Sequence, residues 1–265
     1  MRNKQVKVIF TAIALIAILI LVIGIWQKSD SSQRKGLQEI FFASSDKVYA
    51  EKLIEKNGHK YTIDDYTITL EETLYDGTAN IGYCVFSIVK EGGRPEIELN
   101  SSNQSVTGGF GKNGRFRMGK FASQESKYEV SGDVLYLYFS FRADEDFQGN
   151  VKIVDTENKN KKYEYRLSDM EEYNEYILDK QTNIFISPIG ILINSESDIK
   201  GEVTLHYKDG KEKVAVNTEK EIGTGLSRVS KKDGKVRSLY TFKELQNIQN
   251  IDYILVNDNK IMNVK

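Results

Sequence analysis

Six residues from Gly109 to Gly114, GFGKNG, match the glycine pattern G-x-G-x-x-G that holds phosphate groups in nucleotide-binding proteins. That use requires a helix N-terminus directly after the glycines, or a strand pair with a downstream lysine and a catalytic loop. The residues that follow, RFRMGKF, alternate like a strand and supply neither partner. We therefore interpret the motif as a hairpin loop and expect no cofactor.

Two serine–lysine pairs have the S-x-x-K spacing of penicillin-recognising enzymes, Ser44 with Lys47 and Ser197 with Lys200. That chemistry also needs Ser-Asp-Asn and Lys-Thr-Gly elements, and neither tripeptide occurs in the chain. The hydrolase pattern G-x-S-x-G is missing as well. The serines therefore predict no catalytic nucleophile.

Metal-ligating and thiol chemistry has few candidate residues. The two histidines, His59 and His206, belong to no H-x-x-x-H pair, and His206 lies on the polar side of an alternating segment, so we expect no metal ligand. The single cysteine, Cys84, lies within the apolar run IGYCVFSIV. We expect it to be a small buried core residue, and a reactive thiol remains the alternative.

Acidic residues occur in short clusters, as hydrolysis of glycosides would require if two carboxylates faced each other across a cleft. Adjacency in sequence does not establish that separation, and we interpret the clusters as solvated loops and strand ends. The clusters are Asp64-Asp65, Glu71-Glu72, Asp144-Glu145-Asp146 and Glu171-Glu172.

Four tyrosines alternate along two segments, Tyr136 with Tyr138 and Tyr163 with Tyr165. A row of exposed rings on a sheet stacks sugar rings or anchors a protein partner. The other interpretation is that these rings cover the second face of each sheet, since aromatic residues form strands well.

An unbroken run of 19 uncharged residues, 8–26, determines how the remaining elements are presented. As a helix it is roughly 28 Å long, close to the thickness of a hydrocarbon core. Residues 27–36 contain no Ala-x-Ala-like cleavage site, which favours an uncleaved anchor over a cleaved signal peptide. Basic residues flank both ends, so the charge bias is nearly balanced; the short tail of residues 1–7 favours a cytoplasmic N-terminus.

The composition excludes several function classes. The net charge of −1 gives no electrostatic reason to bind nucleic acid. One cysteine allows no internal disulfide, and 15 Tyr and 12 Phe with many Val, Ile and Thr favour strands.

The spacing of apolar residues changes along the chain. Residues 37–56 suit one or two helical segments, with Ser45 as a candidate cap and Asn57-Gly58 as the stop. From His59 the period becomes two, and Asp209-Gly210 between two alternating runs predicts a hairpin with a type I′ turn. The polar stretch 168–180 is the expected linker. Short strands with turn signals every 8 to 12 residues favour sandwiches.

Residues 61–88, YTIDDYTITLEETLYDGTANIGYCVFSI, resemble the opening of an extracytoplasmic domain of bacterial anti-sigma-factor-like membrane proteins. There a Y-x-I-x-L-x-x-x-x-Y-D-G strand and turn precedes an apolar strand. ISPIGILI (186–193) and the closing segments IDYILVND and KIMNV are similar to the C-terminal half of those proteins. The resemblance implies two successive immunoglobulin-like sandwiches outside a membrane anchor and supplies no catalytic residue. Those proteins carry a cytoplasmic sigma-binding domain before the membrane span, whereas about seven residues precede the span in this chain. We therefore expect the extracytoplasmic module without the sigma-binding domain.

We therefore expect an all-β protein with an N-terminal transmembrane helix, in which a short juxtamembrane helix precedes two tandem immunoglobulin-like β-sandwiches. The expected division is a cytoplasmic stub at 1–7, an anchor at 8–26, a tether and helix at 27–57, and sandwiches at 58–170 and 171–265. The expected role is non-catalytic envelope sensing or protein interaction by a single-pass cell-membrane protein whose bulk is extracytoplasmic, with no catalytic, cofactor or metal residue. A wall-polysaccharide-binding module and a hydrolase with a site assembled from distant acidic residues are the alternatives.

Overall fold

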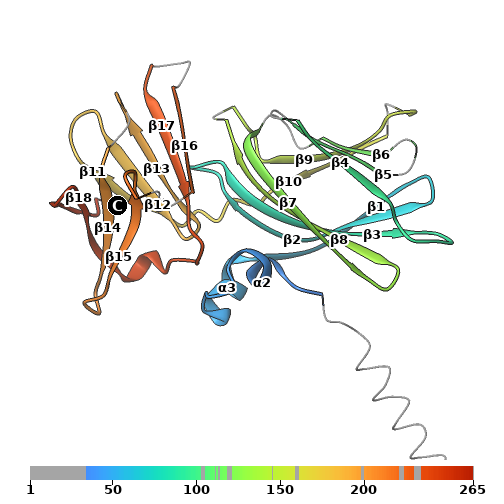
Figure 1. The fold of residues 1–265 in the computed structure, drawn as a ribbon, viewed down its shortest axis with the longest axis horizontal. Helices are drawn as coiled ribbons and strands as arrows, with labels where there is room; N and C mark the ends of the chain where they lie inside the picture. The colour runs from blue at the N-terminus through green and yellow to red at the C-terminus, as the bar shows by residue number, and fades with distance from the viewer. Residues whose placement is uncertain are drawn as a thin grey trace, which may run out of the picture. The chain divides into compact units, whose positions relative to one another are not determined.

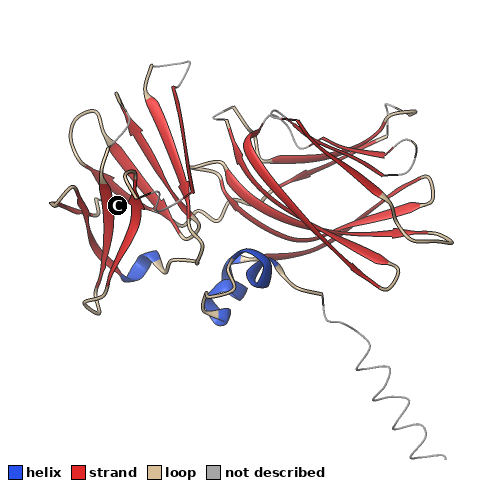
Figure 2. Cartoon of the chain, viewed as in Figure 1, coloured by secondary structure: helices blue, strands red, loops and turns tan. Residues whose placement is uncertain are grey.

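Strands make up most of the chain that the computed structural model describes (Figure 2). The described residues are 34–102, 105–110, 112, 114–117, 121–144, 146–158, 161–197, 200–220, 224–229 and 234–264. Two short helices, α2 (Leu37–Phe41) and α3 (Lys47–Leu53), precede the strands, and a 3-10 turn, η1 (Ile248–Asn250), lies before the last two. The protein is therefore mostly β, as the alternation of apolar residues predicted.

The first half of the strands forms two five-stranded sheets in which all neighbours are antiparallel (Figure 1). The first sheet has the order β1 (Glu55–Ile63), β2 (Tyr66–Asp76), β3 (Ile81–Lys90), β8 (Val134–Ala143), β7 (Phe121–Ser131). The second sheet has the order β10 (Lys162–Arg166), β9 (Asn150–Asp155), β6 (Gly114–Arg117), β5 (Ser105–Phe110), β4 (Ile97–Ser102).

The later strands form two further antiparallel sheets. The third sheet has the order β11 (Asn174–Ile177), β12 (Asn183–Ser187), β13 (Gly190–Ser195), β17 (Val236–Thr241), β16 (Thr224–Val229). The fourth has the order β15 (Glu212–Asn217), β14 (Glu202–Tyr207), β18 (Ile251–Val256), β19 (Asn259–Met262). The stretch 168–180, expected as a linker, therefore contains a strand, because β11 pairs with β12 in the third sheet.

Three clusters of buried apolar residues hold these sheets. The first core joins Phe86 and Phe139 of the first sheet to Val151 and Ile153 of the second. The second core joins the third and fourth sheets. The third core lies on the other face of the first sheet, where Tyr83 and other residues pack with α2, α3 and residues 189–245.

A β-bulge in β2 explains why one strand contributes to two of these cores. Leu70 lies opposite Phe86 and Glu72 lies opposite Val85, so β2 has one more residue than β3 between the two pairs. Before the bulge, Ile68 and Leu70 face the first core; after it, Leu74 faces the third core. A strict alternation through residues 66–75 would have placed Leu70 and Leu74 on the same face.

One hairpin turn differs from the expected type. The hairpin at Asp209-Gly210 is confirmed, but only Gly210 has a positive φ, at 84°, so the turn is not type I′. Gly210 N donates to Tyr207 O, as in a type I turn followed by a left-handed glycine. The two-residue turn between β18 and β19 has positive φ at both Asn257 and Asp258, the pattern of type I′.

The helices also correct the expected boundaries. Asp46, not Ser45, caps α3, because Asp46 Oδ1 accepts a 2.8 Å hydrogen bond from Tyr49 N. Asn57 lies within β1, and β1 begins at Glu55, so the helical stretch ends before the expected stop. Among the described residues no helix is long and apolar enough to cross a membrane, and the run 8–26 lies outside them.

Candidate functional site

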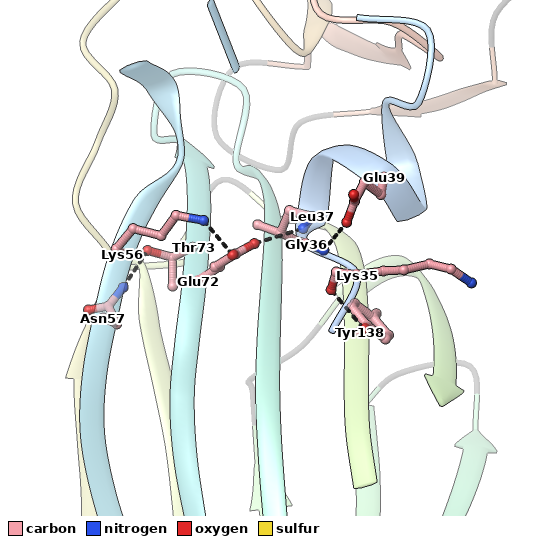
Figure 3. A network of polar contacts seen from close by, with 9 residues as sticks. All are labelled: Lys35, Gly36, Leu37, Glu39, Lys56, Asn57, Glu72, Thr73 and Tyr138. Carbon is pink, nitrogen blue, oxygen red and sulfur yellow. Dashed lines mark hydrogen bonds and ion pairs between the residues drawn. The ribbon is translucent and has the colours of Figure 1, made fainter. Parts of the chain in front are cut away.

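The bulge in β2 turns one carboxylate, that of Glu72, toward the segment that precedes the sheets (Figure 3). Its side chain is 1% exposed. Glu72 Oε2 accepts a 2.7 Å hydrogen bond from Leu37 N, the first residue of α2. Glu72 Oε1 lies 2.5 Å from Lys56 Nζ in β1. Both oxygens of the buried carboxylate are thus paired, which burial of a charge requires.

The residues next to Leu37 are bound as well, as Figure 3 shows. Tyr138 donates from its hydroxyl to Lys35 O at 2.9 Å. Gly36 N donates to Glu39 Oε2 at 2.7 Å, which satisfies a backbone group at the start of the helix. Lys35 Nζ lies 2.6 Å from Glu129 Oε1, and this contact raises the pKa of the lysine. Residues 35–37 are therefore attached to both β2 and β8.

Apolar contacts continue the attachment along both helices. Leu37, Phe42 and Ala50 are fully buried in the third core. The ring of Phe42 lies 4.8 Å from that of Tyr83 in β3, in an edge-to-face arrangement. The helices thus cover an apolar face of the first sheet.

The same helices make polar contacts with the segment before η1. Ser45 Oγ accepts a 2.7 Å hydrogen bond from Leu245 N. Tyr49 donates from its hydroxyl to Gln246 O at 3.1 Å, and burial raises the pKa of this tyrosine. Ser45, expected as a helix cap, therefore bonds a residue 200 positions away.

A second polar cluster lies on the opposite face of β2. Thr73 Oγ1 accepts from Asn57 Nδ2 and donates to Glu55 Oε2, both at 3.1 Å. The Tyr165 hydroxyl is 2.7 Å from Asn57 Oδ1 and 3.1 Å from Glu55 Oε1. Burial and the nearby Glu55 raise the pKa of Tyr165 to about 12, and the His59 ring lies 4.8 Å from its ring. The cluster joins β1, β2 and β10.

The glycine motif lies in a strand pair, whereas Ser197 and Lys200 of the second serine–lysine pair both line a polar hollow. In the glycine motif, Gly109 lies in β5 and Gly114 in β6, and these strands pair with each other. Gly111 and Asn113 lie outside the described residues, and so do Asp198 and Ile199 between Ser197 and Lys200. Ser44 is exposed in the turn between α2 and α3.

His206 lies in β14 of the fourth sheet, whereas His59 and Cys84 lie in the first sheet, on β1 and β3. His206 Nδ1 is 3.1 Å from Glu212 Oε1, and its ring stacks on that of Tyr253 with centroids 4.4 Å apart. Within the part of the chain that the structure describes, no group of three His, Cys, Asp or Glu residues suits a metal ion. Cys84 is fully buried in the first core, as expected, and burial raises the pKa of its thiol.

The four tyrosines do not form one exposed strip. Tyr138 is fully buried in the third core, and Tyr136 packs against that core. Tyr163 and Tyr165 belong to the second sheet and pack against the first core, with Tyr163 4.6 Å from the Tyr61 ring. The rings therefore cover sheet faces, which was the second interpretation of this pattern.

The described members of the acidic clusters lie in different elements of the fold. Asp64 and Asp65 form the turn between β1 and β2, and Glu71 accepts a hydrogen bond from Ser87. Glu171 has a positive φ of 53° before β11. Glu145 lies outside the described residues.

One polar hollow of about 330 Å³ lies beside the turns of the third and fourth sheets. Asn257 supports it: Asn257 Oδ1 accepts from Glu202 N, and its Nδ2 donates to Lys200 O. Carboxylate, ammonium, hydroxyl and amide groups occur together in its lining. These groups include those of Asp179, Thr182, Ser195, Glu196, Lys200 and Asn259.

Sequence reasoning assigned Glu72 to a solvated acidic pair and missed its role. The signal was the double glutamate, which interrupts the alternation of apolar and polar residues in this strand. An extra residue at that point is what turns Glu72 from the side of Leu70 toward α2.

Comparisons with known proteins add no function. No family model matches the sequence, and no curated protein matches it significantly. A solved structure described as a conserved domain protein from Bacillus anthracis aligns over 81% of this chain and 82% of its own, with 12% sequence identity and a TM-score of 0.36.

Proposed function

We propose that the chain is a single-span membrane protein that presents two tandem immunoglobulin-like β-sandwiches outside the cytoplasm. In this proposal residues 8–26 form the anchor and residues 1–7 a cytoplasmic stub. The module acts by binding another protein of the bacterial envelope rather than by catalysis.

The observation that carries the proposal is the attachment of residues 35–37 to the first sheet. Lys35 O is bound by Tyr138 and Leu37 N by Glu72. Residues 27–34 alone separate this attachment from the apolar run. A fully extended chain covers at most about 3.6 Å per residue, so the attached residue Lys35 is separated from the end of the run by no more than roughly 30 Å of chain. An anchor at 8–26 would hold the β region close to the membrane surface.

The sandwich assignment is supported by the two strand cores. The first core combines residues of the first and second sheets, and the second core combines residues of the third and fourth. Two antiparallel sheets that share one apolar core are the architecture of a sandwich. The proposed domains are 58–170 and 171–265.

The anchor is tested by placing charge in the middle of the run. The full chain with Leu15→Arg and Leu19→Arg is compared with wild type and with a Leu15→Ile, Leu19→Ile control in a bacterial host. Each arginine at a span centre costs about 2.5–3.5 kcal/mol of insertion free energy. We expect wild type and control in the carbonate-washed membrane fraction and the arginine variant outside it. Membrane retention of the arginine variant would contradict the anchor.

The topology and the partner are tested on the same full chain carrying a C-terminal tag. External protease should remove the tag from spheroplasts, and protection of the tag would contradict an extracytoplasmic location. Affinity purification in mild detergent should recover one envelope protein in a near-stoichiometric amount. Recovery of no protein together with saturable binding to isolated cell wall would contradict the protein-interaction role.

Binding of wall polysaccharide is the second candidate, and the polar hollow is the observation that favours it. Amide, hydroxyl and carboxylate groups are the groups that bind sugar hydroxyls, and about 330 Å³ is within the range of small-ligand sites. The test is calorimetric titration of soluble wall fragments into wild type and Glu196→Ala. The matched control is Glu219→Ala, an exposed glutamate that is not among the lining residues. Equal affinity in all three proteins would exclude the hollow as the site.

A further inference from the structure

The strand β7 forms one edge of the first sheet, and among the described strands only β8 pairs with it in that sheet (Figure 1). It is 11 residues long. An edge strand of this length presents a row of backbone N–H and C=O groups that a further strand can pair with. Proteins commonly cover such an edge, place charged residues on it, or pair it with another strand.

Among the residues of β7 whose burial is described, two large apolar side chains are exposed. Tyr128 is 65% exposed and Val130 is 54% exposed. Their opposite neighbours on β8 are Leu137 and Leu135, which are buried in the first core. Since directly opposite residues share one face of the sheet, Tyr128 and Val130 extend the apolar face of the first core beyond its covered part.

The charges on either side of Tyr128 are complementary when two copies of β7 pair antiparallel. If Tyr128 lies opposite Tyr128 of a second copy, Lys127 lies opposite Glu129 of that copy, and Glu129 lies opposite its Lys127. The two neighbouring registers that also keep the same faces together place Lys127 or Glu129 opposite itself. Like charges directly opposite destabilise a strand pair, so the Tyr128-centred register is favoured.

The contacts within the chain are compatible with this pairing. Glu129 Oε1 pairs with Lys35, and a carboxylate accepts further hydrogen bonds through its two oxygens. Lys127 Nζ lies 5.2 Å from the Phe41 ring centroid, and the Lys127 side chain is exposed. Both contacts are made by side chains, so neither uses the backbone groups of β7 that a further strand would pair with.

We propose that two copies of this chain associate through β7, antiparallel and with Tyr128 opposite Tyr128, so that the two first sheets become one continuous sheet. The arrangement is a two-fold symmetric interface in which the same patch serves both copies. It goes beyond the proposed function, since it specifies self-association and holds whatever partner the module binds.

The register is tested by disulfide trapping on the full chain in its native membrane. Directly opposite Cα atoms lie about 4.5–5.5 Å apart, within the range that a disulfide bridges. We expect Tyr128→Cys to give a dimer on mild oxidation. Val130→Cys should give none, because its two copies would be offset by four residues, roughly 13 Å along the strands. Wild type controls for Cys84, which is fully buried. A dimer from Val130→Cys equal to that from Tyr128→Cys, or none from either, would overturn the proposal.

The charge pairing is tested by reversal and exchange, measured by sedimentation of the detergent-solubilised full chain. Lys127→Glu or Glu129→Lys alone places like charges opposite each other twice per dimer, so the dimer dissociation constant should rise about tenfold. Both changes together restore opposite charges and should return it to within about threefold of wild type. Lys60→Glu, the same charge reversal at an exposed residue of β1 on the opposite edge of the sheet, is the control and should leave the constant unchanged. A monomeric wild type, or a double variant as weak as the single ones, would overturn the proposal.

Discussion

Glu72 and Leu37 are 35 positions apart in the sequence, yet Glu72 Oε2 accepts a 2.7 Å hydrogen bond from Leu37 N, and both side chains are buried. The carboxylate therefore fixes the place where the chain enters the folded strands. Because the β2 bulge directs Glu72 to this point, the attachment of the N-terminal segment depends on the bulge.

Replacing Glu72 should loosen that segment selectively. Glu72→Ala removes the acceptor of Leu37 N and the partner of Lys56, so we expect a loss of about 2–3 kcal/mol in the free energy of unfolding. Glu72→Gln keeps an acceptor and should lose about 1 kcal/mol. Chemical denaturation measures the loss, and hydrogen exchange should show faster amide exchange in residues 36–54. Equal losses in the two variants would show that the hydrogen bond to Leu37 does not contribute separately.

A close approach inside the first sheet makes Gly82 sensitive to one added carbon. A Cβ at Gly82 would lie 2.2 Å from Cζ of Phe141, whose ring centroid is 5.5 Å from that of Phe147. Because the buried ring has little room to move, Gly82→Ala should cost about 1–3 kcal/mol of stability. Gly58→Ala is the matched strand control, since a Cβ there would meet nothing within 4 Å. Thermal denaturation of both variants checks this, and similar melting temperatures would contradict the packing explanation.

Much of the strand layout could be predicted from sequence, because alternation and turn residues act locally. The hairpin at Asp209-Gly210 and the pairing of β18 with β19 follow from such signals. The attachment site could not be predicted in the same way. Glu72, Ser45 and Tyr138 have partners 35, 200 and 103 positions away, and no local pattern specifies those contacts.

The tyrosine pattern shows that the burial of a side chain is likewise not predictable from local alternation. Tyr136 and Tyr138 alternate with leucines, which predicts that the two rings share one face of the strand. The alternation does not predict which element covers that face. In the structure α2 and α3 cover it, which buries Tyr138. A residue on the second face of a strand is thus exposed or buried according to elements distant in sequence.

Asp76 should make the protein less stable as pH rises through its titration. Burial raises the pKa of this carboxyl, with Asp169 adding to the effect, while a hydrogen bond from Ser187 opposes it. A group whose folded-state pKa exceeds its unfolded value, about 3.9 for Asp, contributes stability that is present below the unfolded value and lost above the folded one. Asp76→Asn keeps an acceptor for Thr78 N and Ala79 N and removes the buried charge. We therefore expect the variant to be more stable than wild type at pH 7, with the difference disappearing below about pH 4.

The matched control for this titration is Asp209→Asn. Asp209 is exposed, and its pKa is lowered by Lys211, so its contribution has the opposite sign: it is present above the unfolded value and lost as pH falls. Asp209→Asn should therefore be slightly less stable than wild type at pH 7. Urea denaturation from pH 3.5 to 8 distinguishes the two, and a destabilised Asp76→Asn variant at pH 7 would show that the charge itself is stabilising.

Cys84 should resist thiol reagents as long as the first core is closed. It is fully buried on the central strand β3, opposite Thr73 and Phe139, and burial raises the pKa of the thiol. Reaction requires thiolate and access together, so labelling of the native full chain should be slow and should follow opening of the core. Val48→Cys adds a thiol at a position that is 63% exposed, which should react in a separate fast phase. Denaturant should convert the slow phase of Cys84 into a fast one; if Cys84 reacts as fast as the added thiol under native conditions, the first core opens far more readily than its burial implies.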